Sequence, residues 1–350
     1  MTMTIPHIPH PPRIPSRASG LITAMLLAGL SFSQAVVAQQ TEGLDDPGRA
    51  GYLSALAGKT VAFVPLTMGF DLTRGWLAGL KAELEPLGVK VIVRDPNLNV
   101  NVGAQAITTL INEKADVIIV QPPDPQTYTK LLKRAEETGS QVVTINMRTA
   151  YVPLLHVGND WTGMGEQSAT AMVQACKGKS GKVAILLGSF VSSDSTYTLK
   201  GFRNVFAKHP EIKVVSVQSG DWDAVKSKGI VQTVLKQHPD LCGVLGPWDG
   251  QDSGSAAAIK EAGLTGKVFL ITSGAGEQSS ACDQVKAGAY DIYMSYDVST
   301  QAKEMAASIK WLLQNKGKTG TSKGTIYSRI VPITKANAST EGICWKLGKT

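Results

Sequence analysis

The chain has 350 residues, of which 43% are hydrophobic and 18% are charged. The length is enough for two domains of ordinary size, and the composition supports hydrophobic cores and excludes a disordered chain. The formal net charge is +7, but the lysines and arginines form no basic stripe and no aromatic-basic array, so we expect no nucleic-acid partner.

The amino terminus has the pattern of a secretory signal peptide. Arg13 and Arg17 supply the positive end, residues 21–32 form the apolar segment, and Val36-Val37-Ala38 is a small-residue cleavage site. The apolar segment is too short to span a bilayer. We therefore expect residues 1–38 to be removed and the mature chain, with a net charge of +5, to be exported as a soluble protein.

Residues 59–80 set the pattern for the rest of the chain. After a poorly patterned lead-in over residues 39–58, the β-branched and aromatic run 60–64 predicts a buried strand. Asp71 can cap the helix that follows, whose apolar residues recur every three or four positions. Ligands of parallel α/β sheets bind beyond the carboxyl ends of the strands, so the loop 65–71 is a candidate binding segment.

The same strand-loop-helix unit recurs in two series. We predict further strands at 89–94, 115–120, 141–145 and 154–157, then at 182–187, 212–217, 241–245, 267–271 and 291–294, and a last one at 325–331. Strands that alternate with helices indicate parallel sheets with right-handed crossovers. Two series of about five strands exceed one comfortable sheet. The predicted fold class is therefore α/β, with two doubly wound parallel-sheet domains.

Four cysteines are present, at positions 176, 242, 282 and 344, as suits an oxidising compartment. None forms a C-x-x-C pair, so the spacing does not indicate a zinc or thioredoxin-like site. Three pairings are possible. We favour Cys242–Cys282, because these residues flank neighbouring strand-helix units, which leaves Cys176 to pair with Cys344.

Several segments in order resemble one family over residues 59–332. They are VPLTMGFD, VVTINMR, HVGNDWTGMG, LKGF, SGDWDAVKSKG, LCGVLGPWDGQDSGSAAAIKEAG and YMSYDVSTQA. This order is similar to that of the periplasmic binding proteins of sugar ABC transporters, of the ribose/galactose type. The resemblance implies two lobes joined by a three-strand hinge that closes over a ligand. The implied lobes are 59–158 plus about 297–325, and 159–296 plus about 326–350.

The second half departs from the family pattern at three places. The helix that normally begins with an arginine here has Asp194 or Thr198 in that region. The usual asparagine before an aspartate is Trp248 before Asp249, and Ser273-Gly274 replaces the usual aspartate after the strand 267–271. A pocket without these groups is not expected to bind ribose or galactose in the family's standard way.

The resemblance and the loop positions give a set of candidate ligand-binding residues. Trp222 and Trp248 follow strands and have carboxylates beside them, which suits the apolar face and the hydroxyls of a sugar. The alternatives are that these tryptophans only pack between domains, that Asp71 is only a helix cap, and that Arg148 is a surface residue. The full set is Phe70, Asp71, Asn146, Arg148, Asp194, Trp222, Trp248, Asp249, Ser273 and Tyr296.

Signatures of catalysis are missing from the sequence. There is no nucleophile elbow, P-loop or zinc-binding run, and the glycines at 274 and 276 lack the third glycine of a dinucleotide fingerprint. Asp249 and Asp252 could supply only two carboxylate ligands, with no further acidic cluster beside them, which is too few for a metal site. We expect no enzyme activity, cofactor or metal. The expected function is a monomeric receptor that delivers a sugar or polyol to an ABC permease, and the alternative is a ligand-sensing partner of a membrane chemoreceptor or sensor kinase.

Overall fold

The structure is a computed structural model that describes residues 46–316 and 322–348. The expected signal peptide and residues 39–45 of the lead-in lie outside the described residues, as do residues 317–321 before the last predicted strand. The unit that begins at Pro47 carries all the helices and strands reported below.

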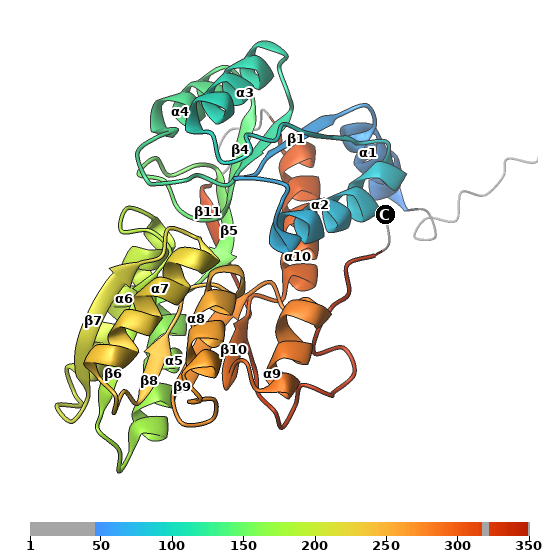
Figure 1. Ribbon diagram of the computed structural model, residues 1–350. Coiled ribbons are helices and arrows are strands. Elements are labelled where there is room, and N and C mark those ends of the chain that lie inside the picture. The colour runs from blue at the N-terminus through green and yellow to red at the C-terminus, as the bar shows by residue number, and fades with distance from the viewer. Residues whose placement is uncertain (1–45, 317–321, 349–350) are drawn as a thin grey trace, which may run out of the picture. The chain divides into compact units, whose positions relative to one another are not determined.

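The first sheet has six parallel strands in the order β11-β5-β4-β3-β1-β2. Figure 1 labels β1, β4, β5 and β11. The strands of this sheet are β1 (Thr60–Val64), β2 (Lys90–Val93), β3 (Val117–Val120), β4 (Gln141–Asn146), β5 (Leu155–Asn159) and β11 (Gly324–Ser328). The central strands β1, β3 and β4 are almost entirely buried, as expected for β-branched runs covered on both faces.

Helices cover both faces of the first sheet. The flanking helices are α1 (Pro47–Leu56), α2 (Asp71–Leu84), α3 (Val100–Asn112), α4 (Thr129–Glu137) and α10 (Val298–Gln314), with a 3-10 turn η1 (Glu85–Leu87) after α2. Alternate residues of β1 divide between them: Val61 and Phe63 pack in the cluster of α2 and α10, whereas Ala62 and Val64 pack in the cluster of α3 and α4. The period-two alternation of a strand thus supplies two cores.

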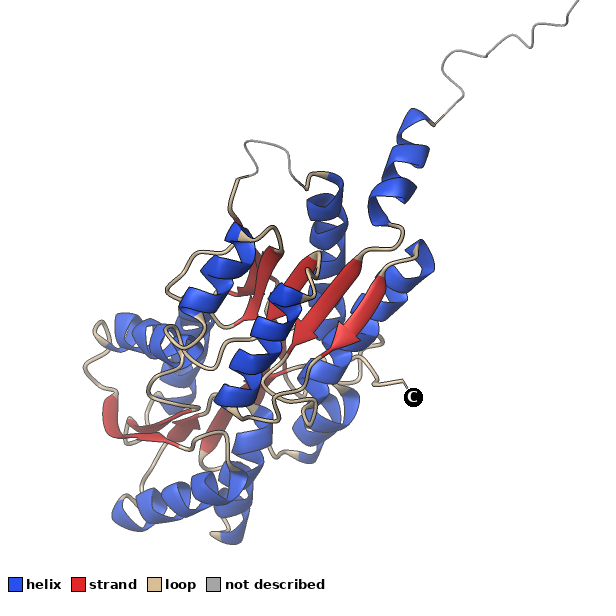
Figure 2. Cartoon of the chain, turned by 90° about the horizontal axis from the view of Figure 1, so that it is seen from above, coloured by secondary structure: helices blue, strands red, loops and turns tan. Residues whose placement is uncertain are grey.

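The second sheet has the order β12-β10-β9-β8-β6-β7, in which only β12 is antiparallel. Its strands are β6 (Lys182–Leu187), β7 (Lys213–Ser219), β8 (Gly243–Leu245), β9 (Phe269–Gly274), β10 (Ile292–Ser295) and β12 (Val331–Ile333). Together with the first sheet it confirms the predicted α/β fold class. Figure 2 shows helices on both sides of the strands.

The second sheet is covered in the same way as the first. Its helices are α5 (Trp161–Cys176), α6 (Ser193–Phe206), α7 (Ala224–Gln237), α8 (Asp249–Glu261), η2 (Gln278–Cys282, a π-helix) and α9 (Asp283–Ala287). Val183 and Ile185 of β6 pack in the cluster of α5 and α6, while Ala184 and Leu186 pack in the cluster of α7 and α8.

The chain passes between the two sheets three times. It leaves the first sheet after β5, returns between β10 and β11, and crosses again between β11 and β12. The prediction of one last strand over 325–331 was therefore wrong. Ser328 ends a strand of the first sheet and Val331 begins a strand of the second, so Arg329 and Ile330 form the crossing.

The lead-in contains a helix that the sequence pattern did not predict. α1 begins at Pro47, a residue favoured in the first turn of a helix. Only Leu56 of this helix is buried, so it has no apolar stripe to recognise. Among the helices described, none is both long and apolar enough to cross a membrane.

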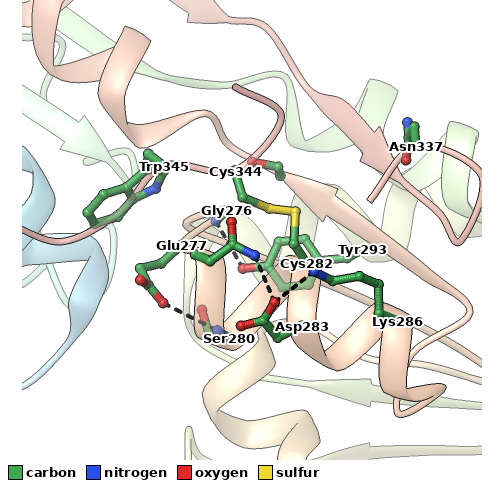
Figure 3. Close-up of a disulfide and its surroundings, with 12 residues drawn as sticks. Gly276, Glu277, Ser280, Cys282, Asp283, Lys286, Tyr293, Asn337, Cys344 and Trp345 are labelled. Atoms are coloured by element: carbon green, nitrogen blue, oxygen red, sulfur yellow. Dashed lines mark hydrogen bonds and ion pairs between the residues drawn. A yellow bond between two sulfur atoms is a disulfide. The ribbon is translucent and has the colours of Figure 1, made fainter. Parts of the chain in front are cut away.

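The disulfide pairing that we favoured was wrong. The bridges are Cys176–Cys242 and Cys282–Cys344, with Cα–Cα distances of 5.7 and 6.2 Å. Figure 3 shows the second of them. Cys242 precedes β8 and lies at the amino end of the sheet, where Cys176 ends the helix that leads into the neighbouring strand β6. Cys242 packs in the cluster of α5 and α6, whereas Cys282 packs in the cluster of α7 and α8, so the two cysteines lie on different faces of the sheet.

Helices α5 and α6 approach closely because Gly201 has no side chain. A Cβ on Gly201 would overlap the carbonyl oxygen of Thr162 and lie 2.9 Å from the Cα of Gly165. We expect Gly201→Ala to lower the free energy of unfolding by about 2 kcal/mol, because overpacking outweighs the gain in helix propensity. Denaturant unfolding measures this. Gly229→Ala on α7 is the matched control, since a Cβ there meets nothing within 4 Å, and it should not destabilise the protein.

Candidate functional site

A small cavity lies where the carboxyl ends of the two sheets face each other. Its volume is about 30 Å³, enough for a water molecule but not for a sugar ring. We call it the central cavity. It is lined by Leu66, Phe70, Leu72, Leu98, Gln121, Asn146, Met147, Trp161, Asp194, Trp222, Trp248 and Tyr296.

The first sheet contributes polar side chains from the ends of its strands. Gln121 directly follows β3, and its Oε1 accepts a hydrogen bond from the backbone N–H of Leu66 at 3.1 Å. Asn146 ends β4 with a left-handed backbone, at φ 66°. Its Oδ1 accepts from Asn159 Nδ2 at 3.3 Å, and its carbonyl accepts from Trp161 Nε1 at 2.9 Å. These bonds fix both amides at the edge of the cavity.

The second sheet contributes two tryptophans that are seated against glycines. A Cβ on Gly188 would overlap the indole of Trp222, and a Cβ on Gly250 would overlap the indole of Trp248. Trp222 has a left-handed backbone, at φ 60°, and its backbone N–H donates to Gln251 Oε1 at 2.9 Å. The local sequence therefore leaves room for each ring and holds the loop that carries it.

Aromatic rings contact one another across the central cavity. The centroids of Phe70 and Trp248 are 4.7 Å apart with an interplanar angle of 60°, and those of Trp222 and Trp248 are 6.4 Å apart. Trp161 and Tyr296 form a further edge-on pair at 5.2 Å. Since Phe70 precedes α2 and Trp248 precedes α8, the first of these contacts joins the two sheets' loops.

Two buried polar atoms in the lining have no partner. Asp194 Oδ1 and Trp248 Nε1 each lack a hydrogen bond within the described part of the chain. The Asp194 side chain is held by Ser192 and by the backbone N–H of Ser195, and burial raises its pKa to about 6. Leaving a buried donor and a buried acceptor unpaired is costly, so each is suited to a ligand.

Asp71 and Asp249 lie beside the central cavity, in a groove of about 550 Å³. Ser280 Oγ donates to Asp71 Oδ2 at 3.0 Å, while Asp249 accepts from the Tyr293 hydroxyl at 2.6 Å and from the Gly250 N–H at 2.7 Å. Burial, reinforced by the charge of Asp71, raises the pKa of Asp249 to about 8. Burial also raises the pKa of Asp71, which begins α2 and does not cap it.

The pKa of Asp249 predicts a pH-dependent stability. Because this pKa is raised on folding, the folded state binds more protons, and its stability falls as the pH rises from about 4 to about 8. We expect Asp249→Asn to reduce the slope of unfolding free energy against pH by up to about 1.4 kcal/mol per pH unit. Denaturant unfolding at several pH values measures both slopes. Equal slopes for the two proteins would contradict the assignment.

Arg148 and Ser273 do not line the central cavity. The Arg148 guanidinium donates to the Tyr327 hydroxyl at 2.9 Å and lies over the Tyr327 ring, 5.4 Å from its centroid. Ser273 Oγ bonds the Tyr296 hydroxyl at 2.5 Å and donates to the carbonyl of Pro247. Ser273 thus positions Tyr296, while Arg148 faces away from the cavity.

The structure brings six of the ten candidate residues together in the lining. They are Phe70, Asn146, Asp194, Trp222, Trp248 and Tyr296. Leu66 lies in the loop 65–71 that the sequence indicates as a binding segment, whereas Leu72, Leu98, Gln121, Met147 and Trp161 were not among the predicted ligand-binding residues. Gln121 could have been found, because it follows a predicted strand. Among the residues described, no three His, Cys, Asp or Glu side chains are grouped so as to hold a metal ion.

The chain matches known proteins over most of its length. A family model described as "periplasmic binding protein domain" matches residues 61–318. A D-apiose import binding protein of Actinobacillus succinogenes is 26% identical over 55% of this chain and 62% of its own. The D-allose-binding periplasmic protein of Escherichia coli is 25% identical over 81% of this chain and 90% of its own. The chain spans about three fifths of the first curated relatives that it matches.

Solved structures share the fold. An ABC transporter solute binding protein from Burkholderia graminis, in complex with D-arabinose, superposes with a TM-score of 0.73 at 24% identity. The superposition covers 81% of this chain and 98% of that one.

Proposed function

The chain belongs to the periplasmic binding protein family, and from this premise we propose that it is an exported receptor that captures a sugar or polyol and delivers it to an ABC permease. The relatives named above are import or periplasmic binding proteins of sugars, which supports transport over sensing and over catalysis. The central cavity is the proposed binding site.

The unpartnered pair of Asp194 Oδ1 and Trp248 Nε1 carries this proposal. A hydroxyl group can donate to the first atom and accept from the second. The surrounding rings supply flat apolar faces of the kind that pack on the C–H face of a sugar. A polyhydroxylated ligand therefore satisfies both orphaned groups and buries apolar surface at the same time.

Binding requires the two sheets to part. The cavity of about 30 Å³ is too small for a ring, and the contact of Phe70 with Trp248 occupies the space that a ligand would take. The three crossings of the chain are the natural hinge, because within the described residues they are the only covalent connections between the two sheets. Neither disulfide joins the sheets, since both bridges lie within the second half of the chain.

We place the six lining candidates in contact with the ligand. Asp71, Asp249, Arg148 and Ser273 act from outside the central cavity. The proposed lobes are 59–158 with about 297–328, and 159–296 with about 331–348. We further propose that residues 1–38 direct export to the periplasm and that the receptor acts as a monomer.

Isothermal titration of the purified protein against a panel of pentoses, hexoses and polyols tests the proposal. At least one member should bind with micromolar affinity or better, and its binding should be weakened by Asp194→Ala. If the protein is folded and no member of the panel binds, the carbohydrate assignment fails.

A further inference from the structure

The lining of the central cavity carries one acidic side chain and no basic one. None of its twelve residues is a lysine, arginine or histidine, and Asp194 is the only carboxylate. Asp194 is 5% exposed and leaves Oδ1 unpaired. Around it stand five aromatic residues, Phe70, Trp161, Trp222, Trp248 and Tyr296.

The surroundings of Asp194 do not neutralise its charge. Its own neighbours Ser192 and Ser195 give hydrogen bonds without a positive charge. Tyr296 is the titratable group that faces it, and the pKa of that phenol is raised by burial and by the charges of Asp194, Asp249 and Asp252. Arg148 donates its backbone N–H to Ser193 Oγ, but its guanidinium is directed to Tyr327.

We propose that the ligand carries a protonated amine that lies against Asp194, so that the site takes an amino sugar or an amino polyol in preference to the neutral parent compound. This inference rests on the proposed function and narrows its ligand class. The amine donates to Asp194 Oδ1 and supplies the missing counter-charge. A ligand hydroxyl or ring oxygen accepts from Trp248 Nε1.

Two physical arguments favour the amine over a hydroxyl in this position. A buried carboxylate without a cation is costly, and an ammonium group offsets that cost where a neutral donor only partly does. The aromatic rings add cation–π attraction, which strengthens when the cation is withdrawn from water. The same arrangement disfavours sugar acids and sugar phosphates, since it offers an anion a carboxylate and no basic partner.

Matched ligand pairs test the inference by titration calorimetry at about pH 7. The pairs are D-glucosamine with D-glucose, D-galactosamine with D-galactose, and glucamine with sorbitol. In at least one pair the amine should bind about tenfold more tightly than its parent or better. The inference is overturned if every parent that binds does so as tightly as its amine.

Two variants test whether the preference for the amine depends on Asp194. Asp194→Asn should remove the tenfold advantage of the amine. It should weaken the parent compound less than it weakens the amine, because the parent loses only a charge-assisted hydrogen bond. Asp240→Asn is the matched control, because Asp240 is a surface carboxylate paired with Lys182 and lies outside the cavity. It should leave both affinities unchanged. An unchanged preference in Asp194→Asn would overturn the inference.

The pH dependence of ligand affinity in the wild-type protein tests the inference without requiring any variant to fold. Burial raises the pKa of Asp194 to about 6, so the affinity for the amine should fall as the pH drops below that value, while the affinity for the parent changes less. Parallel profiles for amine and parent would overturn the inference. Neutral compounds that bind without any amine preference leave the proposed function standing. A folded protein that binds a member of the wider panel of pentoses, hexoses and polyols but no amine of any pair overturns the inference alone, and one that binds no member of that panel and no compound of any pair defeats both proposals.

Discussion

Trp248→Ala should weaken the binding of whichever ligand the wild-type protein takes by at least tenfold, about 1.4 kcal/mol. The indole belongs to the second sheet's loops and contacts Phe70 of the first at 4.7 Å and Trp222 at 6.4 Å. The substitution therefore removes an aromatic face, the orphaned Nε1 donor and a contact between the two sides of the cavity. Large aromatic residues at the centre of a binding site commonly dominate its energetics.

Titration calorimetry measures the effect, and circular dichroism shows whether the variant keeps its fold. Trp311→Ala is the matched control, because this tryptophan lies on α10, is 53% exposed and is absent from the cavity lining. It should bind ligand as the wild type does. If Trp248→Ala binds with unchanged affinity, Trp248 only packs between the lobes, which is the alternative that the sequence left open.

The regular elements of this chain could be predicted because their apolar patterns are local. The strand 182–187 was predicted with the bounds that β6 has, and the buried β-branched run of β1 needs no tertiary information to recognise. α1 has no such pattern, since its only buried residue is Leu56. The division of the predicted last strand, 325–331, into β11 and β12 could not be predicted either. These strands are separated by only two residues, and they differ in the sheet that each one joins.

The candidate site was predictable in position but not in detail. Residues at the carboxyl ends of parallel strands share one edge of a sheet, and this rule places Asn146, Trp222 and Trp248 correctly near one another. The rule says nothing about where a long side chain turns. Arg148 follows Asn146 by two residues, yet its guanidinium bonds Tyr327, a partner 179 residues away in sequence. Such contacts depend on sheet order, which the local pattern does not encode.

The carboxyl-terminal segment contacts elements that belong to both sheets, and these contacts bear on stability. Cys344 is joined to Cys282, and Trp345 is its neighbour (Figure 3). The Trp345 ring donates its Nε1–H to the carbonyl of Ala275 at 2.7 Å. The Trp345 ring also approaches α2 so closely that a Cβ on Gly75 would lie 2.7 Å from its Cη2. The Cys282–Cys344 bridge therefore holds a tail that packs against α2, a helix of the first sheet.

Replacement of both Cys282 and Cys344 by alanine should lower the free energy of unfolding by about 4 kcal/mol. The bridge closes a loop of 62 residues, and the loss of chain entropy in the unfolded state grows with the logarithm of that length. Cys176 and Cys242 close a loop of 66 residues, so their double alanine variant should lose nearly the same amount. Guanidinium unfolding under non-reducing conditions measures both.

The two variants should nevertheless differ in ligand binding. Only the Cys282–Cys344 bridge fixes the segment that carries Trp345 against α2, whereas Cys176–Cys242 lies at the amino end of the second sheet, away from the cavity-bearing edge. We expect the loss of the former to change ligand affinity and the loss of the latter to leave it unchanged. A stability loss below about 1 kcal/mol in either variant would contradict the loop-entropy argument. The matched loop lengths mean that a difference in affinity between the two variants cannot be explained by a difference in stability. Equal affinities in the wild type and both variants would show that the carboxyl-terminal tail does not influence ligand binding.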